Sequence, residues 1–270
     1  MKKNNNILGV LVVLLSIVVL GLTGFIVYDK VLNKDAKEVN NNAELENVKN
    51  DLDEIVKNEL YVLWNKNSIG EITTQERLQL ALERYAKDNN YDLKMYQPEK
   101  VTASELESSY NKTSVTINPL VHQNIYFYEK VGCGNAILYS YDDSTKTYTV
   151  NPSGRGVIKI EPTYSKIVSF EEKGKDSYHI AYQYLFTWIN HGEVDNNVYL
   201  SYDDASKQVN GIKVFNYSGN NVFNSYDELE TKLKSFVENN YDELKNKLIT
   251  CNYDFDYENG KYNLKNYYLS

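Results

Sequence analysis

The chain has 270 residues, and its 29 Lys and Arg against 37 Asp and Glu give a net charge of −8 at pH 7. This acidic balance opposes binding to nucleic acid or other polyanions, while the length permits a domain with a sizeable hydrophobic core. The 25 Tyr and the scarcity of Arg fit A/T-rich codons, which indicates a low-GC bacterial source more than a specialised function.

The first predicted element is an apolar helix over Ile7–Val27. These 21 positions carry no charge, and at about 1.5 Å per residue they span about 32 Å, enough to cross the hydrocarbon core of a bilayer. Because no small-residue cleavage pattern follows, the run predicts an uncleaved, single-pass anchor whose partner is the lipid bilayer.

The charges around this helix predict its orientation. Residues 1–6 hold two lysines, and such a short basic tail favours a cytoplasmic N-terminus. The remainder then lies outside the cell membrane, with residues 28–42 as a polar juxtamembrane linker and 43–270 as an extracytoplasmic domain. A sub-boundary of that domain is predicted near 151–156.

Three helices are predicted in the first half of this domain. Apolar residues recur every three or four positions between 43 and 65, which indicates either a helix packed on its own domain or a coiled-coil stalk. Thr73-x-x-Glu76 and Thr102-x-x-Glu105 are capping boxes, in which both side chains satisfy free N–H groups at a helix start. They predict helices that begin directly after Thr73 and Thr102.

The middle of the chain has the alternation and the turn residues of antiparallel strands. The predicted strands are 124–131, 136–141, 147–150, 156–161, 166–170, 178–189, 198–201 and 212–217. The long strand 178–189 has apolar residues on both faces, so both faces are expected to be covered. Ser140–Lys146 and Ser201–Lys207 share the string Ser-Tyr-Asp-Asp, which indicates either two related halves or the same hairpin-turn chemistry used twice.

The last part of the chain returns to helices before it ends in a hairpin. Ser225-x-x-Glu228 and Asn240-x-x-Glu243 predict two helix starts. Strands 251–257 and 262–269 follow, joined by a turn at Asn259-Gly260, where both residues tolerate the positive φ of a tight hairpin.

Helices on both sides of antiparallel strands predict an α+β fold, with helices flanking the sheet. A helix followed by a curled antiparallel sheet resembles cystatin-like and NTF2-like modules, which exported bacterial proteins use often. The resemblance is one of architecture, without a shared motif, and it implies no particular activity.

Cys133 and Cys251 are the only cysteines. Outside the membrane such a pair predicts a disulfide that closes a long loop, and two unpaired thiols are the alternative. No paired-cysteine motif and only three dispersed histidines are present, so no metal site and no cofactor are expected.

Leu248-Ile-Thr-Cys251 resembles the Thr-Leu-x-Thr-Cys strand of sortases. The resemblance implies Cys–His acyl transfer, with Cys251 as nucleophile and His191 as the base that favours its thiolate. The match covers four residues, and the Arg that sortases carry after the Cys is missing, because no Arg follows Arg155.

A polar, glycine-rich loop offers the best candidate for ligand contact. Gly154, Arg155 and Gly156 lie in it, and the Arg155 guanidinium is suited to a carboxylate or phosphate of a partner. The loop lacks the Lys-Ser/Thr of a phosphate-binding loop, so a nucleotide role is not expected.

The sequence thus predicts a membrane-anchored protein of the cell envelope that binds or scaffolds a protein or cell-wall partner outside the membrane. Catalysis is not expected, because nucleophiles, acids and bases do not occur at a telling spacing. The alternatives are the sortase-like acyl-transfer enzyme and a ligand-sensing ectodomain. The latter is disfavoured by the short segment before the anchor.

Overall fold

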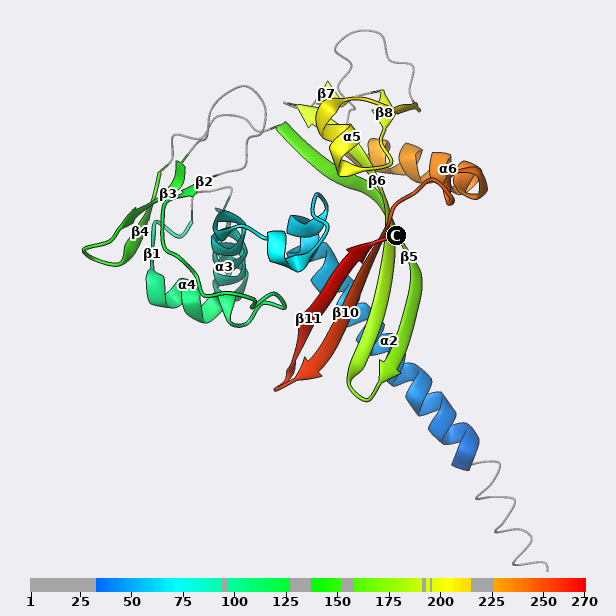
Figure 1. The fold of residues 1–270 in the computed structure, drawn as a ribbon, viewed down its shortest axis with the longest axis horizontal. Coiled ribbons are helices and arrows are strands. Elements are labelled where there is room, and N and C mark those ends of the chain that lie inside the picture. Colours follow the sequence, from blue (N-terminus) through cyan, green and yellow to red (C-terminus); the bar gives the residue numbers. More distant parts are fainter. Residues whose placement is uncertain are drawn as a thin grey trace, which may run out of the picture. The chain divides into compact units, whose positions relative to one another are not determined.

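The computed structural model describes residues 33–93, 97–126, 137–151, 158–190, 193–194, 196–214 and 226–270, whose helices and strands Figure 1 shows. The chain divides into two units, Met1–Asp51 and Leu52–Ser270. Helices and antiparallel sheets are both present, so the predicted α+β class is confirmed. The proposed anchor Ile7–Val27 lies outside the described residues. No helix in the described part is long and apolar enough to cross a membrane.

Helix α2 spans Asn33–Glu59 and is followed by the 3-10 turns η2 (Leu60–Leu63) and η3 (Ile69–Glu71). The helix was expected to begin near residue 43, but residues 33–42 of the predicted linker are helical too. These ten positions contain neither Pro nor Gly, so nothing in them interrupts the helical hydrogen bonds.

The next part of the chain contains sheet A, which we define as the four antiparallel strands in the order β1-β4-β3-β2. Both predicted capping boxes are present, because Thr73 and Thr102 each accept from the N–H of the glutamate three residues later, whose carboxylate reaches back. The elements are α3 (Thr74–Asn89), β1 (Lys100–Thr102), α4 (Ala103–Tyr110), β2 (Ile125–Tyr126), β3 (Ile137–Asp142) and β4 (Thr147–Val150).

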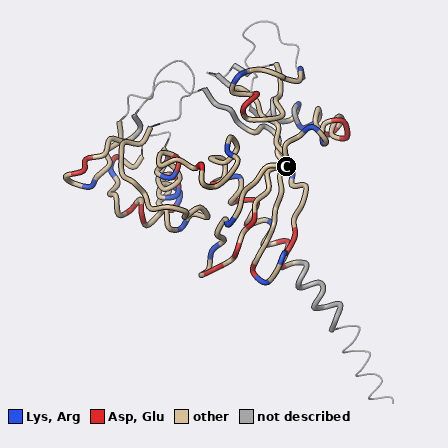
Figure 2. The backbone as a smooth tube through the Cα atoms, viewed as in Figure 1, with Lys and Arg blue, Asp and Glu red and all other residues tan. Residues whose placement is uncertain are grey.

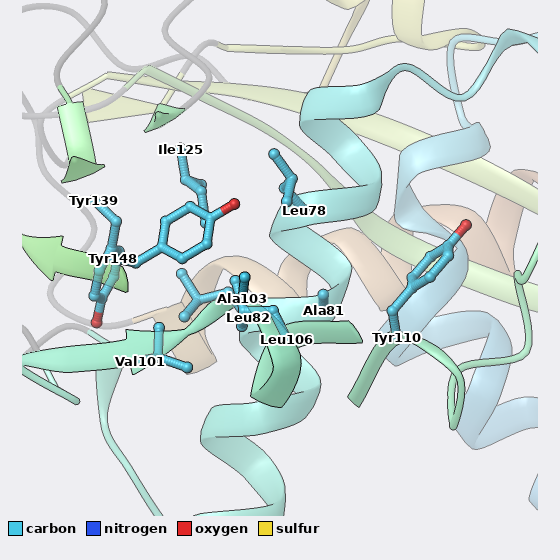
Figure 3. Close-up of a cluster of buried hydrophobic side chains, with 10 residues drawn as sticks. All are labelled: Leu78, Ala81, Leu82, Val101, Ala103, Leu106, Tyr110, Ile125, Tyr139 and Tyr148. Carbon is cyan, nitrogen blue, oxygen red and sulfur yellow. The ribbon is translucent and has the colours of Figure 1, made fainter. Parts of the chain in front are cut away.

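The core of this part lies between the two helices and sheet A (Figure 3). Leu78 and Leu82 of α3 and Leu106 of α4 are fully buried against the rings of Tyr139 and Tyr148. A buried tyrosine needs a partner for its hydroxyl. Tyr139 meets this need by donating to the Pro98 carbonyl oxygen over 2.6 Å.

Sheet B has the antiparallel order β11-β10-β6-β5, with the short β7 also paired to β6. The predicted strands 156–161 and 166–170 are one strand, because irregularities in its pairing with β6 absorb extra residues without ending it. All but the first residue of the predicted sub-boundary at 151–156 lie outside the described residues, so this boundary stays a prediction. The strands are β5 (Ile158–Gly174), β6 (Ser177–Asn190), β7 (Glu193–Val194), β10 (Thr250–Glu258) and β11 (Lys261–Leu269).

Both faces of β6 are covered, as its sequence predicts. On one face Tyr182 donates to Asp53 of α2 over 2.5 Å, and the Tyr184 ring lies 5.9 Å from the Trp64 ring. On the other face Leu185 packs with Val237 of helix α6 (Tyr226–Leu244). Sheet B is therefore the middle layer between two helical layers.

Two local predictions near α6 are wrong. Ser201–Lys207 does not form a hairpin turn; instead Ser201 caps the short helix α5 (Tyr202–Lys207), and Ala205 is fully buried. Asn240 does not start a new helix, because α6 continues through it to Leu244. Its side-chain amide donates to the Phe236 carbonyl oxygen of the same helix. The strands β8 (Asn197–Val198) and β9 (Ile212–Lys213) pair as expected, and the final hairpin turns at Asn259-Gly260 with φ of 56° and 81°.

A short segment, residues 111–115, follows α4 and contacts both α2 and sheet B; it is called the clamp segment below. The buried Ser114 N–H donates to the Glu59 carboxylate of α2 over 2.7 Å, and the Ser114 carbonyl accepts from Leu264 N–H of β11 over 2.9 Å. The Lys261 ammonium donates to the Asn111 carbonyl over 2.7 Å. One stretch of backbone thus satisfies groups on α2 and on the β11 edge of sheet B.

Glu59→Ala should lower the free energy of unfolding by about 1–3 kcal/mol, because the buried Ser114 N–H loses its acceptor. Glu59→Gln should cost less, since its amide oxygen can still accept. The control is Glu54→Ala, an exposed residue of the same helix, with an expected change within about 0.5 kcal/mol. Urea unfolding measures all three variants, and equal effects at Glu59 and Glu54 would contradict the role of the clamp segment.

Candidate functional site

The Cys251 thiol, the predicted nucleophile of the acyl-transfer alternative, has no disulfide partner among the described residues and is only 4% exposed. The Tyr267 hydroxyl lies 3.6 Å from its sulfur. Burial raises the pKa of Cys251 to about 11, although hydrogen bonds from Tyr267 and Tyr253 act in the opposite direction. A catalytic cysteine needs a thiolate at neutral pH, so this environment holds Cys251 in the unreactive form.

The histidine nearest to Cys251 in the pairing of sheet B does not face it. Cys251 pairs with Tyr182, whereas His179 pairs with Asp254, whose carboxylate oxygen lies 2.7 Å from its Nδ1. Because Cys251 and Asp254 are an odd number of residues apart on β10, their side chains lie on opposite faces of sheet B. The predicted base His191 lies outside the described residues.

Two further predicted sites also lie outside the described residues. Cys133 does, so its disulfide with Cys251 stays a prediction. The loop of Gly154, Arg155 and Gly156 does as well, and its contact with a ligand also remains a prediction.

A pocket of about 390 Å³ lies beside helix α4. Glu107 and Tyr110 of α4 line one side, and residues 116–120, which follow the clamp segment, line the other. The volume is at the lower end of the range for small-ligand sites. The Glu107 side chain is 56% exposed, so its carboxylate is accessible to a partner.

His122 holds this wall of the pocket to sheet A. Its Nε2 lies 3.0 Å from a Glu107 carboxylate oxygen and its Nδ1 lies 2.8 Å from the Tyr148 hydroxyl. The ring also stacks on Tyr141, with centroids 5.5 Å apart. Burial, above other causes, raises the pKa of Tyr148. The phenol therefore stays protonated and can donate a hydrogen bond to His122.

The lining of the pocket is partly polar and partly apolar. Its described lining offers one carboxylate, amide and hydroxyl groups and the apolar side chains of Ile117, Pro119 and Leu120, without a cysteine or serine. Within the described residues no group of three His, Cys, Asp or Glu is placed to hold a metal ion. Acidic and basic positions are interspersed along the described chain (Figure 2).

Sequence reasoning did not find this pocket. Glu107, His122 and Tyr148 stand 15 and 26 residues apart in the sequence and match no spacing motif. They come together because β4, which carries Tyr148, pairs with β1, the strand directly before α4.

Comparison of the chain with protein-family models, curated proteins and solved structures finds no match. The fold and the pocket define the class: an α+β protein whose described residues form three antiparallel sheets, with a small pocket beside α4.

Cys251→Ser should reduce the loss of stability at alkaline pH. The folded pKa of about 11 exceeds the ordinary 9.0, so above about pH 9 the unfolded chain releases the thiol proton first and the free energy of unfolding falls as pH rises to 11. Two pKa units correspond to about 2.7 kcal/mol. Urea unfolding at about pH 8 and about pH 11 measures the loss; equal losses in both proteins would contradict a buried, protonated thiol.

Proposed function

We propose that this chain is a single-pass, membrane-anchored binding or scaffolding protein, with its folded part outside the cell membrane of a low-GC bacterium. The observation that carries the proposal is the uncharged run Ile7–Val27, which is long enough to cross a bilayer as a helix. The tail at residues 1–6 then lies in the cytoplasm. The partner is a protein or a cell-wall polymer.

The start of α2 supports this organisation. Between Asn33 and Asn47 its only apolar residues larger than alanine are Val39 and Leu45. A helix that is polar on all sides has no face to bury and suits a solvent-exposed spacer. We therefore assign this stretch as the spacer between the anchor and the folded unit that begins at Leu52.

The environment of Cys251 supports binding over acyl transfer, because its thiol is buried and protonated. The pocket beside α4 offers an accessible carboxylate, Glu107, which suits N–H donors or a cationic group of the partner. The contact of Asp53 with Tyr182 also fits the predicted cystatin-like or NTF2-like arrangement, in which a helix lies in the curve of an antiparallel sheet.

Topology is tested with single-cysteine variants of the full chain, in a background with Ser at positions 133 and 251. Asp143→Cys, in a turn where the native side chain is 83% exposed, should react in intact cells with a membrane-impermeant maleimide. Asn5→Cys should react only after the membrane is permeabilised. Labelling in the reverse order, or of both sites in intact cells, would contradict the proposed orientation.

Glu107→Gln tests the pocket as a binding site for the cell wall. Purified full-length protein in detergent should co-sediment with isolated peptidoglycan sacculi, and the substitution should weaken this binding roughly tenfold, as expected for the loss of a charged hydrogen bond. Glu99→Gln is the control, because Glu99 is exposed and lies outside the lining of the pocket. Equal binding by all three proteins would exclude the pocket, and no binding by the native chain would exclude this polymer as partner.

A further inference from the structure

The two edges of sheet B differ. The β11 edge is covered at Leu264, whose N–H donates to the Ser114 carbonyl over 2.9 Å. On the other edge, the backbone of β5 between Tyr164 and Gly174 pairs only with β6 within the described part of the chain. An open strand edge presents unpaired N–H and C=O groups that can pair with another strand.

Apolar side chains accompany this open edge. Val168 is 39% exposed, and Ile167 and Phe170 are partly exposed. The pairing with β6 shifts between Ile167 and Ser169, so Val168 is an extra residue that forms a bulge. From Ser169 to Glu172 the strand pairs with β6 in regular register. The bulge strengthens the local twist but leaves strand residues available on both sides of it.

The segment Lys166–Glu171 is complementary to itself when two copies run antiparallel. Lys166 and Glu171 lie on one face of sheet B, because their β6 partners Gln183 and His179 are four residues apart. Ile167 and Phe170 lie on the other face, opposite Tyr182 and Ile180. Because Val168 is the extra residue of the bulge, it is left out of the pairing. A pairing centred on Ser169 then places Lys166 of one copy opposite Glu171 of the other, and Ile167 opposite Phe170.

We propose that two copies of this chain associate through the open edge of β5, with the segments Lys166–Glu171 paired antiparallel around a two-fold axis. The symmetry repeats each contact, which gives two Lys–Glu pairs and two apolar pairs in addition to backbone hydrogen bonds. The charge pairs fix the register, because a shift that places Lys166 opposite Lys173 brings like charges together.

Within the described residues, the contacts of Lys166 and Glu171 are on the surface, and Lys166 also interacts electrostatically with Asp242. The Lys166 ammonium lies 3.6 Å above the centre of the Tyr241 ring, and Glu171 accepts from the Ser169 hydroxyl over 3.3 Å. Both side chains are exposed, so each can meet a partner without unpacking the core. The proposed anchor would favour the association further by raising the local concentration of the chain.

The test is sedimentation equilibrium of the full chain in detergent micelles. The native chain should show a monomer–dimer equilibrium, and Lys166→Glu should raise its dissociation constant at least roughly tenfold by placing Glu opposite Glu twice. The combined variant Lys166→Glu/Glu171→Lys should restore dimerisation, since the opposite charges meet again. Lys175→Glu, an exposed change in the adjacent turn, is the matched control and should leave the dimer intact.

Several results would overturn the proposal. A native chain that stays monomeric would leave the edge to another kind of partner, and equal effects of Lys166→Glu and Lys175→Glu would place the interface elsewhere. A double variant that stays monomeric with an unchanged melting temperature would exclude this register. None of these results bears on the orientation of the chain in the membrane, which the labelling of residues 5 and 143 tests separately.

Discussion

The hydrogen bond between the buried Ser114 N–H and the Glu59 carboxylate is the constraint on which the rest of the folded unit depends. Sheet A and its helices lie in the chain between α2 and sheet B, so nothing in the connectivity alone holds the two sheets together. The clamp segment, which follows α4, bonds to α2 and to β11 through backbone groups, which have fixed directions, and Arg84 of α3 adds an ion pair to the same glutamate at 3.4 Å. Because Ser114 is buried, water cannot replace the missing partner if the contact opens.

This constraint also determines which surfaces remain available. By covering β11 at Leu264, the clamp segment leaves β5 as the open edge of sheet B. The chain then runs from the clamp segment directly into residues 116–120, which form one wall of the pocket, and on to His122, which bonds to the opposite wall at Glu107. The pocket loop is therefore tied at both ends, which fixes the shape of the pocket.

Features that depend on neighbours in the sequence could be predicted, and those that depend on distant contacts could not. The capping boxes at Thr73 and Thr102 and the turn at Asn259-Gly260 are local chemistry, and all three are present. The repeated string Ser-Tyr-Asp-Asp shows the limit. After Ser140 it forms a turn in which Asp142 accepts from Ser144 N–H, and after Ser201 it starts a helix that buries Ala205. The pocket and the strand order of sheet B follow from tertiary packing alone, so no sequence pattern contains them.

The many tyrosines of the chain also determine the surroundings of Cys251. A tyrosine in a core fills space as phenylalanine does, but its hydroxyl requires a partner. Asp53 supplies one to Tyr182, and Tyr184 and Tyr253 supply each other over 3.3 Å. Cys251 lies among these rings, where burial suppresses its ionisation more than the nearby hydroxyls favour it. The hydroxyls of these three tyrosines therefore bond within the folded unit, and two of their rings help to bury Cys251.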